Sequence, residues 1–169
     1  MTEPDDSVVV VGADERDHGD IDALPIDVDR WCALAEAVLR SESASGELTI
    51  TFVDEAEIAE LNAEHMGKVG PTDVLSFPLD DEDDPTAGVP TLLGDVVISP
   101  AVAAGQFAEH AGTFDDEIAL LVVHGVLHVL GHDHAEPQEA VAMRAREMTL
   151  LCAHHWHEPA PAGFRQTHD

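Results

Sequence analysis

Three histidines at positions 124, 128 and 134 are the residues of this sequence best suited to chemistry, and they lie in the string HGVLHVLGHDH. His124 and His128 are four residues apart. On a helix, two side chains at that spacing project from one face with Cβ atoms about 6 Å apart. Zinc binds imidazole nitrogens at roughly 2.0–2.1 Å, so both rings can reach one ion.

Gly131 supplies the turn that such a site needs. Glycine readily adopts the left-handed conformation that ends a helix, and the turn can bring His134 back as a third ligand. Three protein ligands leave the fourth tetrahedral position of zinc for water, which is typical of a catalytic site. We therefore predict one Zn²⁺ per chain, held by His124, His128 and His134. The zinc-bound water is the expected nucleophile, and the sequence identifies no general base.

Several residues near these three need a separate interpretation. His132 directly follows the glycine and is expected to face solvent or a neighbouring residue. Asp133 could orient a ligand or accept a proton, or it could cap the turn, and the sequence leaves both roles open. His154, His155 and His157 could trap metal, but a helix end running into a mobile tail explains them better.

Gly125 limits which zinc chemistry is expected. The spacing of the three histidines matches the metzincin zinc proteases, in which a glutamate general base follows the first histidine. This chain has glycine at that position, and glycine cannot transfer a proton. A zinc peptidase is therefore a disfavoured alternative.

Three blocks of sequence carry a more specific resemblance: GKVGPTDVLSFP (67–78), LGDVVIS (93–99) and HGVLHVLGHDH (124–134). In order and spacing, over roughly residues 46–153, they resemble the YbeY family of rRNA maturation factors. Val129 and His132 depart from the leucine and tyrosine of the family pattern. The resemblance implies a mixed four-stranded sheet with surrounding helices. It also implies a metal-dependent, single-strand-specific endoribonuclease that acts in 3′-end maturation of small-subunit ribosomal RNA and in ribosome quality control.

The same resemblance extends to partners and to the RNA-binding surface. It implies single-stranded ribosomal RNA, the small ribosomal subunit and its assembly proteins as partners. Lys68, the only lysine of the chain, matches part of a basic patch implicated in RNA binding, whereas Met66 stands where relatives often have arginine. That loss keeps open a second hypothesis, a non-catalytic zinc-containing ribosome assembly factor.

The pattern of apolar residues predicts the elements that position these side chains. Strands are expected at 8–11, 47–53, 74–78 and 92–99, and helices at 27–41, 54–66, from 100, 113–130 and 136–155. The helix that carries His124 and His128 is apolar nearly all round and should lie at the centre of the domain. Strands in the middle and helices at both ends indicate an α+β fold. Residues 80–91, acidic with two prolines, are expected to be an exposed loop.

Length, charge and cysteine content indicate the number of domains, the effect of the surface on RNA and the cellular compartment. The 169 residues suit one domain, predicted at 1–157, followed by a disordered tail at 158–169. Thirty-five acidic against seven basic residues give a net charge of −28, which should repel RNA unless a local feature offsets it. We see no signal peptide or membrane span, and Cys32 and Cys152 suit a reducing compartment. The chain is expected to be cytoplasmic.

Overall fold

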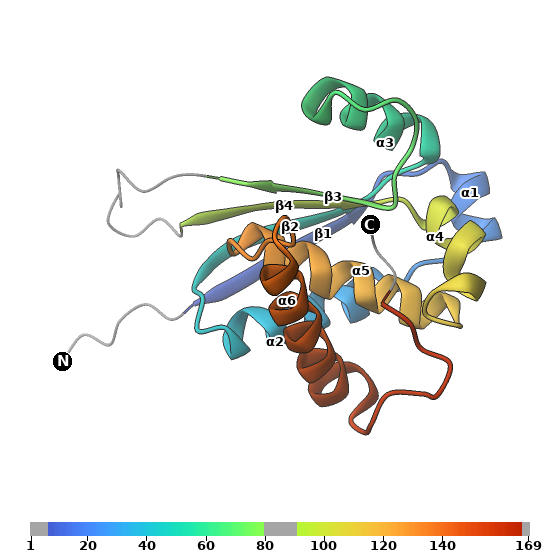
Figure 1. Ribbon diagram of the computed structural model, residues 1–169. Helices are drawn as coiled ribbons and strands as arrows, with labels where there is room; N and C mark the ends of the chain where they lie inside the picture. The colour runs from blue at the N-terminus through green and yellow to red at the C-terminus, as the bar shows by residue number, and fades with distance from the viewer. Residues whose placement is uncertain (1–6, 80–90, 167–169) are drawn as a thin grey trace.

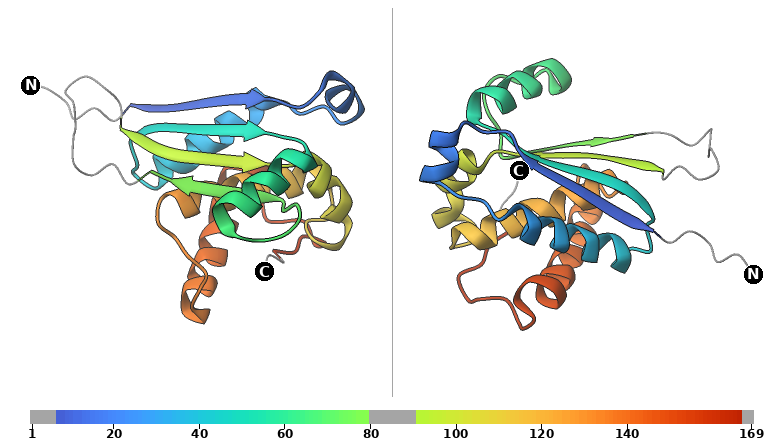
Figure 2. Two further views of the ribbon diagram at one scale, coloured as in Figure 1. Left: turned by 90° about the horizontal axis from the view of Figure 1, so that it is seen from above. Right: turned by 180° about the vertical axis from the view of Figure 1, so that it is seen from behind.

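In the computed structural model, residues 7–79 and 91–166 are described, and they form a mixed four-stranded sheet with helices on both faces (Figure 1). The strands are β1 (Val8–Asp14), β2 (Gly46–Phe52), β3 (Val74–Pro78) and β4 (Leu92–Ile98). Their order across the sheet is β1-β2-β4-β3, which Figure 2 shows from above. β1, β2 and β4 run parallel, and β3 is antiparallel to β4. The predicted α+β class is confirmed.

The helices are α1 (His18–Ala23), α2 (Val28–Ser41), α3 (Glu55–Leu61), α4 (Pro100–Gln106), α5 (Phe114–Val129) and α6 (Pro137–Leu151). α2, α5 and α6 lie on one side of the sheet and α3 on the other (Figure 1). All except α1 were predicted. α1 has six residues and buries none of them, so no apolar period marks it in the sequence.

The centre of the domain is α5, as its apolar sequence predicted. Thirteen of its 16 residues are buried, because the sheet covers one side while α2 and α6 cover others. Thr113 begins the helix by accepting a hydrogen bond from the backbone N–H of Asp116 (3.1 Å). A helix enclosed in this way holds the side chains of its central turns in fixed positions.

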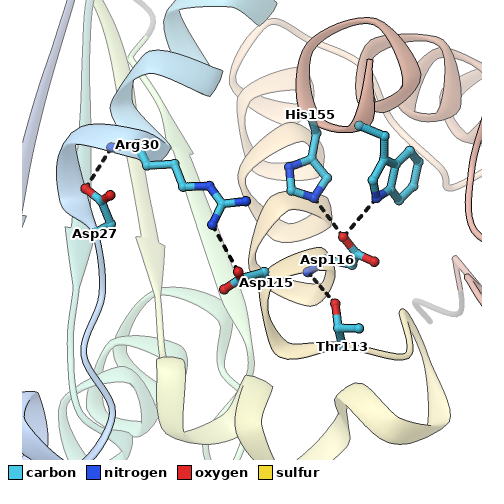
Figure 3. Close-up of polar contacts among 7 residues, drawn as sticks. Asp27, Arg30, Thr113, Asp115, Asp116 and His155 are labelled. Carbon is cyan, nitrogen blue, oxygen red and sulfur yellow. Dashed lines mark hydrogen bonds and ion pairs between the residues drawn. The ribbon is translucent and has the colours of Figure 1, made fainter. Parts of the chain in front are cut away.

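The turn that follows α6 is tied to the start of α5 (Figure 3). Oδ1 of Asp116 lies 2.8 Å from Nε2 of His155 and accepts a hydrogen bond from Nε1 of Trp156 (2.9 Å). Both residues belong to the π-helical turn η3 (Cys152–Trp156) that follows α6. Beside this contact, Arg30 on α2 forms an ion pair with Asp115 (3.0 Å). His155 therefore lies at a helix end, as predicted, and it has a structural partner there.

The expected disordered tail at 158–169 is the main difference between prediction and structure. Phe164 packs edge-on against Trp156, with ring centroids 4.8 Å apart. The backbone N–H of Arg165 donates to the carbonyl of His110 (3.0 Å). The proline- and glycine-rich composition predicted no such docking, because composition does not indicate contacts with particular residues such as His110, which lies 55 residues before Arg165. Residues 167–169, like 80–90 of the expected exposed loop, lie outside the described residues.

Among the described residues, no helix is both long enough and apolar enough to cross a membrane.

Candidate metal centre

His124, His128 and His134 lie together in the structure, as the sequence predicted. One nitrogen from each ring comes within 4.8 Å of the other two, so the group could hold a metal ion. The ring centroids are 4.6 Å apart for His124 and His128, and 4.9 Å apart for His128 and His134. His124 is buried, His128 half-buried and His134 exposed. The cluster thus opens from the core towards solvent.

The half-buried ring of His128 is held in its neutral form. Burial, together with the neighbouring imidazoles of His124 and His134, lowers the pKa of His128 to about 4. Imidazole binds metal through a deprotonated nitrogen. At neutral pH this ring is therefore ready to act as a ligand.

The turn that returns His134 to the cluster is a complete Schellman motif. Gly131 has φ +102°, and its N–H donates to the carbonyl of His128 (3.0 Å). The N–H of His132 donates to the carbonyl of Leu127 (3.0 Å). These two bonds satisfy the last carbonyls of α5. The predicted role of Gly131 is confirmed.

The two neighbours of His134 in this turn face elsewhere. Nε2 of His132 lies 3.2 Å from Oε1 of Glu42, so His132 faces a neighbouring residue as predicted. Oδ1 of Asp133 accepts a hydrogen bond from the backbone N–H of His134 (2.7 Å). Of the two roles left open for Asp133, the structure shows the turn contact.

Glu147 on α6 is a site residue that the sequence analysis missed. Its Oε2 lies 2.6 Å from Nδ1 of His124, and the residue is only 2% exposed. A carboxylate at Nδ1 fixes the ring so that Nε2 faces outward, the arrangement common for metal-binding histidines. The sequence does contain a signal for Glu147, because an acidic residue on an apolar helix face is unusual. Glu147 comes four residues after Met143 and three before Leu150, both of which are buried.

Gln166, in the segment expected to be disordered, holds the other oxygen of that carboxylate. Its Nε2 donates to Oε1 of Glu147 (3.0 Å) and to the carbonyl of Arg144 (2.9 Å). A chain of contacts therefore runs from Gln166 through Glu147 to His124. Nothing in the local sequence around Gln166 indicates this role.

The face of the histidines that points towards β3 opens into a cleft of about 330 Å³, which we call the Lys68 cleft. Its lining includes all three histidines together with Met66 and Lys68. The last two residues are exposed and follow α3 through the π-helical turn η1 (Asn62–Met66). Buried Asn62 donates through Nδ2 to the carbonyl of Gly70 (2.9 Å) and fixes this loop. The structure thus places Lys68 beside the metal ligands.

Ser76 on β3 and Asp73 in the loop before it are two polar residues of this segment that lie near the histidine cluster. Both line the Lys68 cleft, but both also have structural partners. Oγ of Ser76 donates to the carbonyl of Gly125 (3.1 Å). Asp73 accepts from the N–H of Val74 (2.8 Å) and from Nε2 of Gln106 (2.8 Å). These contacts join β3 to α5 and α4.

Gly125 lies where α5 comes closest to the sheet. A Cβ added there would lie 2.6 Å from Cγ1 of Val96 and 3.4 Å from Oγ of Ser76. The missing side chain therefore points at the sheet. Glycine at this position allows the close approach of helix and strand, in addition to excluding the glutamate of the zinc peptidases.

We expect Gly125→Ala to lower the free energy of unfolding by about 1–3 kcal/mol relative to Gly105→Ala, because the added methyl group overpacks against Val96. Gly105 is the control: it also lies in a helix, and a Cβ there meets nothing within 4 Å. Both substitutions replace glycine by alanine within a helix, which favours the helix in each case. The difference between their free energies of unfolding therefore reports the steric overlap with Val96. Urea unfolding at equal zinc content measures it. Equal stabilities of the two variants would contradict the proposed packing.

The donor set fits a zinc-like ion. Three imidazoles converge, and a carboxylate orients one of them from behind. Imidazole ligands suit Zn, Cu, Fe and Ni, whereas Mg and Ca prefer oxygen. A second group with ligand spacing, Asp17, Asp20 and Asp54, consists of exposed or half-exposed carboxylates, which are common on such an acidic chain.

Comparisons with known proteins agree with this geometry. The family model described as Endoribonuclease YbeY matches residues 17–155. The protein of that name from Nocardioides sp. is 48% identical over 139 residues, 76% of this chain and 90% of the relative. The one from Frankia casuarinae is 42% identical over 159 residues, 86% of this chain and 74% of the relative. The solution structure of TM1509 from Thermotoga maritima shares the fold, with a TM-score of 0.53 at 23% identity over 89% of this chain and 91% of that one.

Proposed function

Because the chain belongs to the YbeY endoribonuclease family, we propose that it is a zinc-dependent endoribonuclease that cleaves single-stranded RNA. The observation that supports this most is the placement of His124, His128 and His134 in the wall of the Lys68 cleft. These residues would hold the ion. When bound, zinc supplies a Lewis acid and an activated water for attack on a phosphodiester.

The cleft supports a single-stranded substrate. A volume of about 330 Å³ is at the small end of ligand pockets, and a duplex is far larger. Lys68 in this cleft would hold a phosphate oxygen and offset the negative charge that grows during cleavage. A local positive charge matters here because the net charge of −28 repels RNA from the protein as a whole.

The biological role that we propose is 3′-end maturation of small-subunit ribosomal RNA and ribosome quality control in the cytoplasm. The predicted domain of residues 1–157, together with the docked segment up to Gln166, would act there with the small ribosomal subunit and its assembly proteins as partners. The names of the relatives support the nuclease class. The free thiols of Cys32 and Cys152 suit a reducing compartment.

A non-catalytic assembly factor is the second candidate, and the acidic surface together with Met66 in the cleft favours it. In that case zinc would stabilise the fold, and ribosomal proteins would supply the RNA contacts. Cleavage by the isolated protein separates the two hypotheses.

We expect zinc-loaded protein to cut single-stranded ribosomal RNA in high salt, where the acidic surface is screened, and to leave duplex RNA intact. Chelator-treated protein should not cut. Lys68→Ala should lower the initial rate about tenfold at unchanged zinc content, because one charge-assisted bond to phosphate is lost. Gel analysis of end-labelled RNA measures both effects. Folded, zinc-loaded protein that leaves all RNA intact would favour the assembly factor.

Arg40→Ala is the matched control for Lys68→Ala. It also removes one positive charge, but from the exposed face of α2, where Arg40 pairs with Glu36 (2.9 Å). An equal loss of rate in both variants would show that net charge, and not the position of Lys68, sets the rate.

A further inference from the structure

Most of the few basic side chains of this protein are engaged with carboxylates. All seven lie within the described residues. Four form ion pairs: Arg16 with Asp14, Arg30 with Asp115, Arg40 with Glu36, and Arg146 with Glu42. In a chain with 35 acidic residues, pairing of this kind is the expected state of a cation.

Lys68, Arg144 and Arg165 differ from the other four. Within residues 7–79 and 91–166, none of their side chains forms an ion pair or a hydrogen bond. A guanidinium or ammonium group without a carboxylate partner is available to an anionic ligand. Two of these three cations lie beside the histidine cluster.

Arg144 lines a second cavity, of about 210 Å³, which we call the Arg144 cavity. It is bounded by His124 and His134 on one side and by α6 on the other. The same two histidines also line the Lys68 cleft. The two cavities therefore meet at the proposed metal ligands, and each is lined by a cation that has no ion pair within the described part of the chain.

The one carboxylate in the Arg144 cavity does not cancel its charge. Glu147 is 2% exposed, and its two oxygens face His124 and Gln166. Arg144 is exposed on α6, and only its backbone carbonyl is used, by Gln166. Among residues 7–79 and 91–166, no carboxylate holds the guanidinium away from the histidines.

We infer that Arg144 binds a backbone phosphate of the RNA, on the side of the histidine cluster opposite to Lys68. This inference rests on the proposed nuclease function and extends it. The strand would pass from the Lys68 cleft across His124 and His134 into the Arg144 cavity, with one phosphate held on each side of the scissile bond. A guanidinium can hold phosphate through two parallel hydrogen bonds. A phosphate contact positions the strand without reading its sequence.

The test is binding of a fluorescent, cleavage-resistant RNA, with a 2′-O-methyl and phosphorothioate backbone, to the zinc-loaded full chain. Arg144→Gln should weaken Kd about tenfold for every base sequence tried. The slope of log Kd against log salt should change by about 0.7, the share of one phosphate contact on a single strand. Arg144→Lys, which keeps the charge, should recover part of the affinity. Arg40→Ala is again the control for loss of one charge.

The Arg144→Gln variant should fold like the wild type, because Arg144 is exposed on a helix and glutamine is a good helix former. Unchanged Kd and salt slope for Arg144→Gln, while the wild type cleaves RNA and Lys68→Ala binds it weakly, would overturn the inference and leave the proposed function intact. A wild type that neither binds nor cleaves RNA would overturn both.

Discussion

His128→Ala should remove zinc binding and lower cleavage of single-stranded RNA by at least about a hundredfold. Loss of a residue that only orients a metal ligand already costs 10–100-fold, and His128 would itself be a ligand. Its ring forms one corner of a triangle with those of His124 and His134, and the nearby imidazole of His132 faces Glu42 instead. Elemental analysis of purified protein and initial cleavage rates measure the two losses.

His132→Ala is the matched control for that variant. It removes an imidazole four residues farther along, whose Nε2 faces Glu42 on the other side of the turn. It should retain about one zinc per chain and the rate of the wild type. Equal loss of zinc in the His132 and His128 variants would refute the ligand assignment. Circular dichroism of the His128 and His132 variants would check that both are folded.

Glu147→Ala should weaken zinc affinity about 10- to 100-fold, although Glu147 does not face the ion. The carboxylate fixes Nδ1 of His124 at 2.6 Å. Without it, the ring of His124 can rotate, and its Nε2 becomes a poorer donor. Competition with a chromogenic chelator measures the change. Glu147→Gln, which keeps a hydrogen-bonding group at this position, should lose less affinity.

Glu139→Ala provides the control for Glu147→Ala. It removes the same charge from the same helix, but Glu139 is exposed in the first turn of α6. Its zinc affinity should equal that of the wild type. If Glu147→Ala bound zinc as tightly as the Glu139 variant, the contact with His124 would be structural only. Thermal unfolding of both proteins shows whether the comparison is made on folded material.

The sequence by itself determined the features that depend on neighbours along the chain. The four-residue spacing of His124 and His128 and the glycine at 131 are local signals, and helix geometry converts them directly into a shared face and a Schellman turn. The apolar sequence of α5 predicted its central place for the same reason. The alternation in β2 and the cap at Asp54, whose carboxylate accepts from the N–H of Glu57 (2.8 Å), are likewise local.

Only the tertiary structure decided what surrounds the three histidines. Glu147 lies 23 residues after His124, and Gln166 lies 19 residues after Glu147. Their contacts exist because α6 packs on α5 and the chain end folds back over both. Glu147 has a local signal, as an acid on an apolar helix face, but no periodicity indicates that its partners are His124 and Gln166. The same holds for Lys68 and Arg144, which reach the histidine cluster from the loop before β3 and from α6, two segments far apart in sequence that both border cavities lined by His124 and His134.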